Sequence, residues 1–212
     1  MEFNSLLSFI GNEPVFESSL LLSGDVDPKV VRLQLTRWVK SGKIYQLRRG
    51  VYCLAPPYQK VKPHPFVVAN HLQQASYISL QSALSHYGLI PEIVNIVTSI
   101  SAGRPERVET PFGVFDFRHI KKELLFGYQL IELGGQEASI ATPEKALLDL
   151  VYLQPGGETI TYLKELRLQN IERFDLEVLK KLAEKFGTPK LRLAVKRISK
   201  VIFEEADIYE DL

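Results

Sequence analysis

The residues best suited to chemistry in this 212-residue chain are cations gathered in one segment. Between Pro28 and Pro63 there is no aspartate or glutamate. The basic residues of the segment are Lys29, Arg32, Arg37, Lys40, Lys43, Arg48, Arg49, Lys60 and Lys62. A polyanion responds to the local field more than to the formal net charge of the whole protein, which is only +1. The block therefore indicates a surface for phosphate groups, and a solvated charged face is the alternative interpretation.

Acids, lysines and serines that could support catalysis form no recognisable site. The chain has no GxSxG, no glycine-rich phosphate loop, no HExxH and no CxxC. Glu144, Lys145 and Asp149 could be an acid–base cluster, but all three fall in the first two turns of one helix, where Lys145 and Asp149 are expected to form an i,i+4 pair on the outside. Ser79 and Ser82 have no histidine partner fixed by the sequence, so they are interpreted as a helix cap and a small-residue position. We expect no catalytic residues and no enzyme activity.

The sequence also predicts no metal, cofactor or membrane span. Cys53 is the only cysteine, which excludes an internal disulfide. The four histidines, His64, His71, His86 and His119, lack the close spacing of metal ligands. No apolar run approaches the roughly 20 residues needed to cross a bilayer, and the N-terminus does not resemble a secretion signal. We expect a cytoplasmic protein.

Three short helices are predicted to position the first part of the cationic block. The first covers Phe3–Ile10, and the second is expected from Pro14 to about Gly24. A third helix follows Asp27, a good capping residue, has Pro28 at its first position and ends before Gly42. Three short helices joined by tight turns are typical of a helix-turn-helix.

The third helix is expected to present a polar face for nucleic acid. Val31, Leu35, Trp38 and Val39 share one apolar arc, which can pack on the first two helices. The polar face and its flanks carry Lys29, Arg32, Gln34, Thr36, Arg37 and Lys40. Cations suit phosphates, whereas threonine and glutamine can address base edges. This combination is what a recognition helix requires.

A basic hairpin is predicted directly after this helix. The segment KIYQLRRGVYCLA, residues 43–55, contains two short strands around a turn at Arg48, Arg49 and Gly50. Two arginines at a hairpin tip are well placed to reach a phosphate or the minor groove, and Lys43 adds a further cation. Residues 1–55 are therefore predicted to be a winged helix-turn-helix that binds double-stranded DNA. A winged helix used only for protein contacts is the alternative.

The remainder is predicted to be a larger α+β domain, with a boundary in a proline-rich linker at residues 56–65. Helices are expected over 66–74, 79–88, 142–153, 175–186 and 189 to about 206. Strands are expected over 92–101, 108–110, 113–120, 127–133 and 137–142. The fold class is thus α+β, with a small, mostly antiparallel sheet and several helices in residues 66–212.

Four segments together resemble one family of bacterial proteins. They are WVKSGKIYQLRRGVYCLA (38–55), YISLQSALSHYGLI (77–90), TPFGVFDFRHI (110–120) and TPEKALLDLVYL (142–153). With these segments the chain resembles the AbiEi-type abortive-infection antitoxins, the antitoxin half of type IV toxin-antitoxin pairs that bacteria encode against phage. The match extends over nearly the whole chain.

The resemblance implies a repressor and antitoxin in one chain. The N-terminal module would repress its own operon by binding inverted repeats in the promoter, and the C-terminal domain would neutralise a nucleotidyltransferase-type toxin without a stable complex. The DNA contacts would fall on the polar helix face and hairpin tip described above. Weaker candidates for the antitoxin role are Ser79, Arg118, Glu144, Lys145 and Asp149. Two alternatives stay open, namely a stand-alone regulator with a ligand- or partner-sensing C-terminal domain, and a domain that modifies the toxin or its target.

Overall fold

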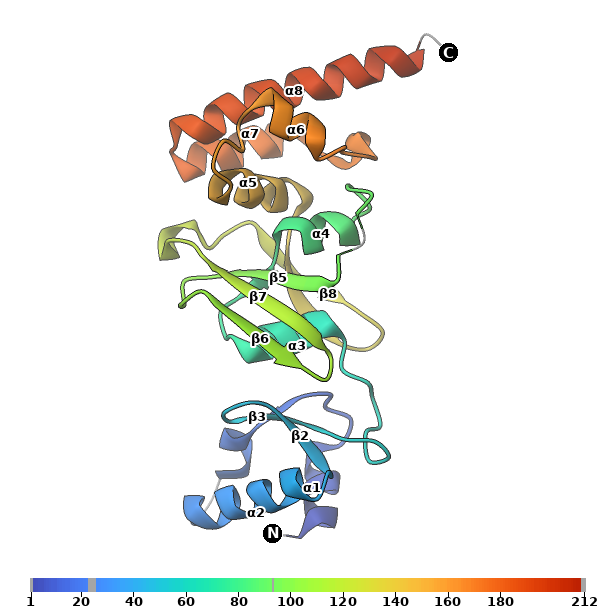
Figure 1. Cartoon of the computed structure of the whole chain (residues 1–212), viewed down its shortest axis with the longest axis vertical. Helices are drawn as coiled ribbons and strands as arrows, with labels where there is room; N and C mark the ends of the chain where they lie inside the picture. Colours follow the sequence, from blue (N-terminus) through green and yellow to red (C-terminus); the bar gives the residue numbers. More distant parts are fainter. Residues whose placement is uncertain (1, 23–25, 93, 211–212) are drawn as a thin grey trace.

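The chain is α+β, and its elements are stacked along one long axis with the two ends of the chain at opposite ends of the molecule (Figure 1). The computed structural model describes residues 2–22, 26–92 and 94–210, with side chains described as far as Lys200. The N-terminal elements are α1 (Phe3–Ile10), β1 (Phe16–Glu17), the 3₁₀ helix η1 (Ser18–Leu22), α2 (Pro28–Lys40), β2 (Ile44–Arg48) and β3 (Val51–Leu54). Strands β1, β3 and β2 form an antiparallel three-stranded sheet in that order.

Helix α2 begins and ends where the sequence predicts. The Asp27 carboxylate accepts a hydrogen bond from the backbone N–H of Lys29 at 2.8 Å, which satisfies one of the free donors of the first turn. Pro28 occupies the first turn, where no N–H is needed. Gly42 comes just after the helix with a φ of +68°, a conformation that glycine adopts without a steric penalty. Val31, Leu35 and Trp38 form the buried face of α2.

The second expected helix, from Pro14 to about Gly24, is wrong in its first part, where Phe16–Glu17 form a strand, and only Ser18–Leu22 are helical, as a 3₁₀ helix. Val15 and Phe16 are both buried, but Val15 belongs to the main core and Phe16 to a separate N-terminal core. Consecutive side chains point to opposite sides only in extended backbone, so this stretch pairs as β1. The 3₁₀ helix η1 comes next along the chain. Gly24 lies outside the described residues.

The hairpin β2–β3 has two buried faces. Ile44, Tyr52 and Leu54 pack with the N-terminal helices. Leu47, Val51 and Cys53 belong instead to the main hydrophobic core. The small sheet is therefore covered by helices on one face and by the rest of the chain on the other. An antiparallel sheet commonly leaves one face to solvent, but this one is buried on both.

The larger part of the chain is built on a six-stranded sheet. Its strands are β4 (Tyr77–Ile78), β5 (Ile96–Ser101), β6 (Glu106–Thr110), β7 (Gly113–His119), β8 (Tyr128–Glu132) and β9 (Glu137–Ala141), in the spatial order β6-β7-β5-β4-β9-β8. Three of its five pairings are antiparallel, as expected, but β4–β9 and β5–β7 pair in parallel, which the sequence did not predict. The sheet is mixed.

Helices lie on both sides of this sheet (Figure 1). They are α3 (Pro65–Leu72), α4 (Leu80–His86), α5 (Pro143–Leu153), α6 (Ile160–Glu165), α7 (Leu176–Phe186) and α8 (Pro189–Glu210), with short 3₁₀ turns η2 (Lys122–Leu124) and η3 (Ile171–Arg173). Helix α3 lies toward the N-terminal elements, and α4 and α5 lie toward the C-terminal helices α6, α7 and α8 (Figure 1). No helix in the described ranges is both long and apolar enough to cross a membrane.

Candidate nucleic-acid interface

The outer face of α2 carries exposed cations that are not paired with acids. Lys29, Arg32, Arg37 and Lys40 are all exposed. Within the described part of the chain, none of these four forms an ion pair. Their charge is therefore not neutralised by the protein itself, as a surface for phosphates requires.

The two polar, uncharged residues predicted for this face differ in their exposure. Thr36 is exposed, and its hydroxyl donates to the backbone carbonyl of Arg32 at 2.9 Å, so it retains lone pairs that can accept a further hydrogen bond. Gln34 is half-buried at the flank of the face. Leu33 lies among the polar residues with 51% of its surface exposed.

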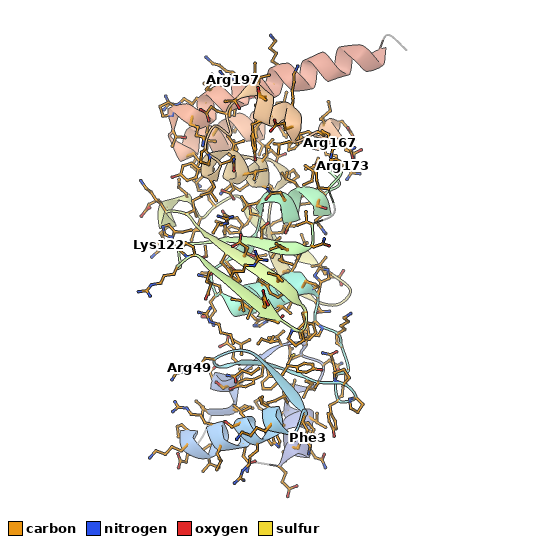
Figure 2. All side chains as sticks on the ribbon, in the orientation of Figure 1. Phe3, Arg49, Lys122, Arg167, Arg173 and Arg197 are labelled. Carbon is orange, nitrogen blue, oxygen red and sulfur yellow. The ribbon has the colours of Figure 1, made fainter. Side chains whose placement is uncertain are left out.

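A hollow of about 600 Å³ separates α2 from the hairpin. Arg32, Thr36 and Lys40 line it from the helix, and Gln46 and Arg49 line it from the hairpin. Among the described residues that line it, none is acidic. Figure 2 shows Arg49 at the hairpin end, at the outer edge of the N-terminal elements. The structure thus brings one predicted hairpin arginine to the same concavity as three predicted residues of α2.

The other predicted hairpin cations are occupied elsewhere. The Arg48 guanidinium donates to the backbone carbonyl of Leu72 and pairs with the Glu106 carboxylate at 3.0 Å, so it faces the larger part of the chain. The Lys43 ammonium lies over the Phe3 ring, 4.6 Å from the ring centre. Neither lines the hollow beside α2.

The residues considered for catalysis or antitoxin contact form a second group, deep in the larger part of the chain. The expectation that Lys145 and Asp149 pair on the outside of their helix is wrong, since both side chains are fully buried. The Lys145 ammonium donates to Asp149 and to the Tyr77 hydroxyl, the latter at 2.8 Å. Asp149 also accepts from the Tyr77 hydroxyl at 3.0 Å and from the Ser79 hydroxyl at 2.8 Å. We call these four residues the buried polar cluster.

Aromatic and backbone groups enclose the ammonium of this cluster. Lys145 Nζ lies 4.6 Å from the centre of the Phe186 ring and 5.1 Å from that of Phe126. The backbone of Gly127, at a φ of +70°, passes so close that an added Cβ would come within 3.2 Å of the Lys145 stem. Burial raises the pKa of Asp149 and lowers the pKa of Lys145, because each loses the solvation of its charge.

The buried polar cluster therefore joins β4 to α5 and is closed to solutes. Ser79 is the N-cap residue of α4 by position, but its hydroxyl bonds Asp149 instead of the helix backbone, so the expected capping role of its side chain is wrong. Tyr77 was not anticipated from the sequence, because its strand is only two residues long and pairs with segments far along the chain.

The remaining candidates lie apart from that cluster. Glu144 is 5% exposed and accepts from the backbone N–H of Asp175 at 3.0 Å, which ties α5 to the start of α7. Arg118 is exposed on β7 and pairs with Asp116 at 2.8 Å. Ser82 donates to the carbonyl of Ile96 at 3.0 Å, a bond that fixes α4 against β5. Only Arg118 of the five antitoxin candidates is open to a partner.

No group of three or more histidine, cysteine or acidic residues comes together as a metal site within the described ranges. Cys53 is completely buried, and burial raises the pKa of its thiol to about 12. A protonated, buried thiol is neither a good nucleophile nor a good metal ligand.

The chain matches no protein-family model. No protein of curated function matches it in sequence. Its fold is shared with a solved structure, that of the RV2827C protein from Mycobacterium tuberculosis, with a TM-score of 0.53 over 92% of this chain and 75% of that one. Because the two sequences are only 13% identical, the similarity concerns the fold alone.

Proposed function

We propose that residues 1–55 act as a winged helix-turn-helix that binds double-stranded DNA, with α2 as the recognition helix and the β2–β3 hairpin as the wing. The observation that carries the proposal is the row of exposed cations on α2 without an ion pair among the described residues, of which Arg32 and Lys40 line one hollow together with Arg49. The element order supports it, since two short helical segments precede α2 and an antiparallel hairpin comes after it. A major groove about 12 Å wide admits a helix such as α2.

In this proposal the protein represses its own operon by binding inverted repeats in the promoter. Arg32, Arg37 and Lys40 neutralise phosphates, Thr36 and Gln34 address base edges, and Arg49 reaches the backbone or the minor groove. A protein of this kind acts in the bacterial cytoplasm, where the chromosome lies. This regulatory part of the proposal rests on the resemblance to AbiEi-type antitoxins.

Salt-dependent binding to the protein's own promoter fragment tests the DNA contacts. Each phosphate contact contributes about 0.9 to the slope of log affinity against log salt. Replacing Arg32, Arg37 or Arg49 singly by alanine should lower that slope by about this amount and weaken binding at physiological salt. Lys181→Ala is the matched control, because Lys181 is an exposed lysine on α7, at the far end of the molecule from α2 (Figure 1). If the three arginine variants all retain the slope of the unaltered protein, the α2 assignment fails.

The antitoxin part of the proposal concerns residues 66–212. On the same resemblance, we propose that this part neutralises a nucleotidyltransferase-type toxin without a stable complex and without catalysing a reaction. The test is whether a neighbouring gene encodes such a toxin, whether its expression alone arrests growth, and whether this protein relieves the arrest. Arg118→Ala is the informative variant, since Arg118 is the exposed member of the antitoxin candidates. Absence of a toxic neighbour would favour a stand-alone regulator with a ligand- or partner-sensing domain.

A further inference from the structure

We propose that Arg48 is a positioning residue, through which the larger part of the chain holds the hairpin tip so that Arg49 faces the hollow beside α2. This inference rests on the proposed DNA binding by that hollow. It assigns the two neighbouring arginines of the tip to different tasks. Arg49 lines the hollow proposed to receive DNA, whereas Arg48 contacts Glu106 and the Leu72 carbonyl.

The first observation is the pair of anchors on Arg48. One end of its guanidinium donates to the carbonyl of Leu72, the last residue of α3. The same nitrogen lies 3.0 Å from Glu106 Oε1, on the first residue of β6. Both partners belong to the larger part of the chain, and β6 is an edge strand of its sheet. The hairpin tip is thus tied to two elements outside its own sheet.

A second observation is the irregular register that points Arg48 in this direction. Consecutive residues of a regular strand point to opposite faces. Leu47 belongs to the main core, yet Arg48 also reaches the larger part of the chain. The pairing of β2 with β3 shifts between Gln46 and Arg48, and an irregularity of this kind redirects a side chain. The bulge therefore turns the Arg48 side chain toward Leu72 and Glu106.

The opposite side of the tip is held as well. The backbone N–H of Ser18 donates to the carbonyl of Gly50 at 2.8 Å. Glu17, next to it in β1, accepts from the Gln74 side chain at 2.7 Å, just beyond the end of α3. With Arg48 on one side and β1 on the other, the backbone at Arg49 is fixed between two supports. A fixed backbone loses less conformational entropy when Arg49 binds a phosphate.

The decisive variant is Glu106→Ala, with Glu109→Ala as its control. Both changes remove one acid from β6, but Glu109 is exposed and forms no ion pair within the described part of the chain. Removal of an acid alone would leave DNA binding unchanged or strengthen it. If Glu106 positions Arg48, Glu106→Ala should instead weaken promoter binding by up to about fivefold, the contribution of a partly exposed ion pair. Arg48→Ala should do the same without lowering the salt slope by the roughly 0.9 expected for a lost phosphate contact.

Hydrogen exchange gives a second measurement that needs no DNA. The amides of residues 49–51 should exchange faster in Glu106→Ala than in Glu109→Ala, because the tip opens more often. The inference is overturned if Glu106→Ala matches its control in both measurements, or if Arg48→Ala lowers the salt slope as Arg49→Ala does. Failure of the unaltered protein to bind its promoter would refute the proposed function instead, and the exchange rates would still decide whether Glu106 holds the tip.

Discussion

At the scale of the residue, Cys53 shows how burial determines chemistry. Its side chain has no exposed surface, and it packs where the hairpin meets the main core. Burial raises the pKa of the thiol from its ordinary 9.0 to about 12. The reactive thiolate is therefore suppressed in the folded protein. We expect a thiol reagent at pH 8 to modify Cys53 only as fast as the protein opens, and to modify it at once in denaturant.

The same shift predicts a pH dependence of stability. Between pH 9 and 12 the unfolded thiol has lost its proton while the folded thiol retains it. The folded state then binds one more proton, so the free energy of unfolding falls as pH rises, by about 1.4 kcal/mol per pH unit within this window. The contribution is fully present below pH 9. Denaturant titrations of the unaltered protein and of Cys53→Ala between pH 9 and 10.5 should differ in this slope, and equal slopes would contradict the assignment.

At the scale of the element, the buried polar cluster decides how α5 meets β4. Asp149→Leu would leave the Lys145 ammonium buried without its counter-charge, which costs about 3–5 kcal/mol. The double variant Lys145→Met with Asp149→Leu removes both charges and should recover much of that loss. It should not recover all of it, because the hydroxyls of Tyr77 and Ser79 lose their acceptor. Chemical unfolding measures the stability of the single and of the double variant. A double variant less stable than the single one would contradict this role of the pair.

Elements with strong local signals could be predicted from the sequence. Asp27 and Pro28 define the start of α2, and Thr142 caps α5 by accepting from the N–H of Lys145 at 3.3 Å. Strand β1 could not be predicted in this way, because Val15 and Phe16 are divided between two cores that only the whole chain creates. The two parallel pairings are missed for a similar reason: β4 pairs with β9, far along the chain, and β5 pairs with β7 instead of with β6, the next strand in sequence.

In the candidate site, too, features set by local sequence could be predicted and features set by the whole fold could not. The polar face of α2 can be predicted from helical spacing alone, and the structure leaves it exposed as expected. An i,i+4 pair has the same spacing whether it is exposed or buried, so the sequence did not reveal that Lys145 and Asp149 lie in the core. Likewise, two adjacent arginines at a hairpin tip look equivalent until Glu106 and the carbonyl of Leu72 distinguish Arg48 from Arg49.

At the scale of the whole molecule, the N-terminal elements are joined to the rest through a shared core. Leu47, Val51 and Cys53 of the hairpin belong to the same hydrophobic cluster as α3, α5 and the large sheet. The Tyr45 ring also meets the Phe112 ring edge-on, with 6.4 Å between ring centres. Shared apolar burial of this kind couples the unfolding of two parts of a chain.

We therefore expect one unfolding transition, and the chain supplies a probe to check it. Trp38, the only tryptophan, lies on the buried face of α2 in the N-terminal core, so its fluorescence reports the N-terminal elements. Far-UV ellipticity reports mainly the helices beyond residue 64. The two signals should change at the same denaturant concentration. Leu35→Ala weakens only the N-terminal core, by about 3 kcal/mol, and should move both transitions together. A fluorescence transition that shifts while the ellipticity transition stays in place would show that the hairpin does not couple the two parts.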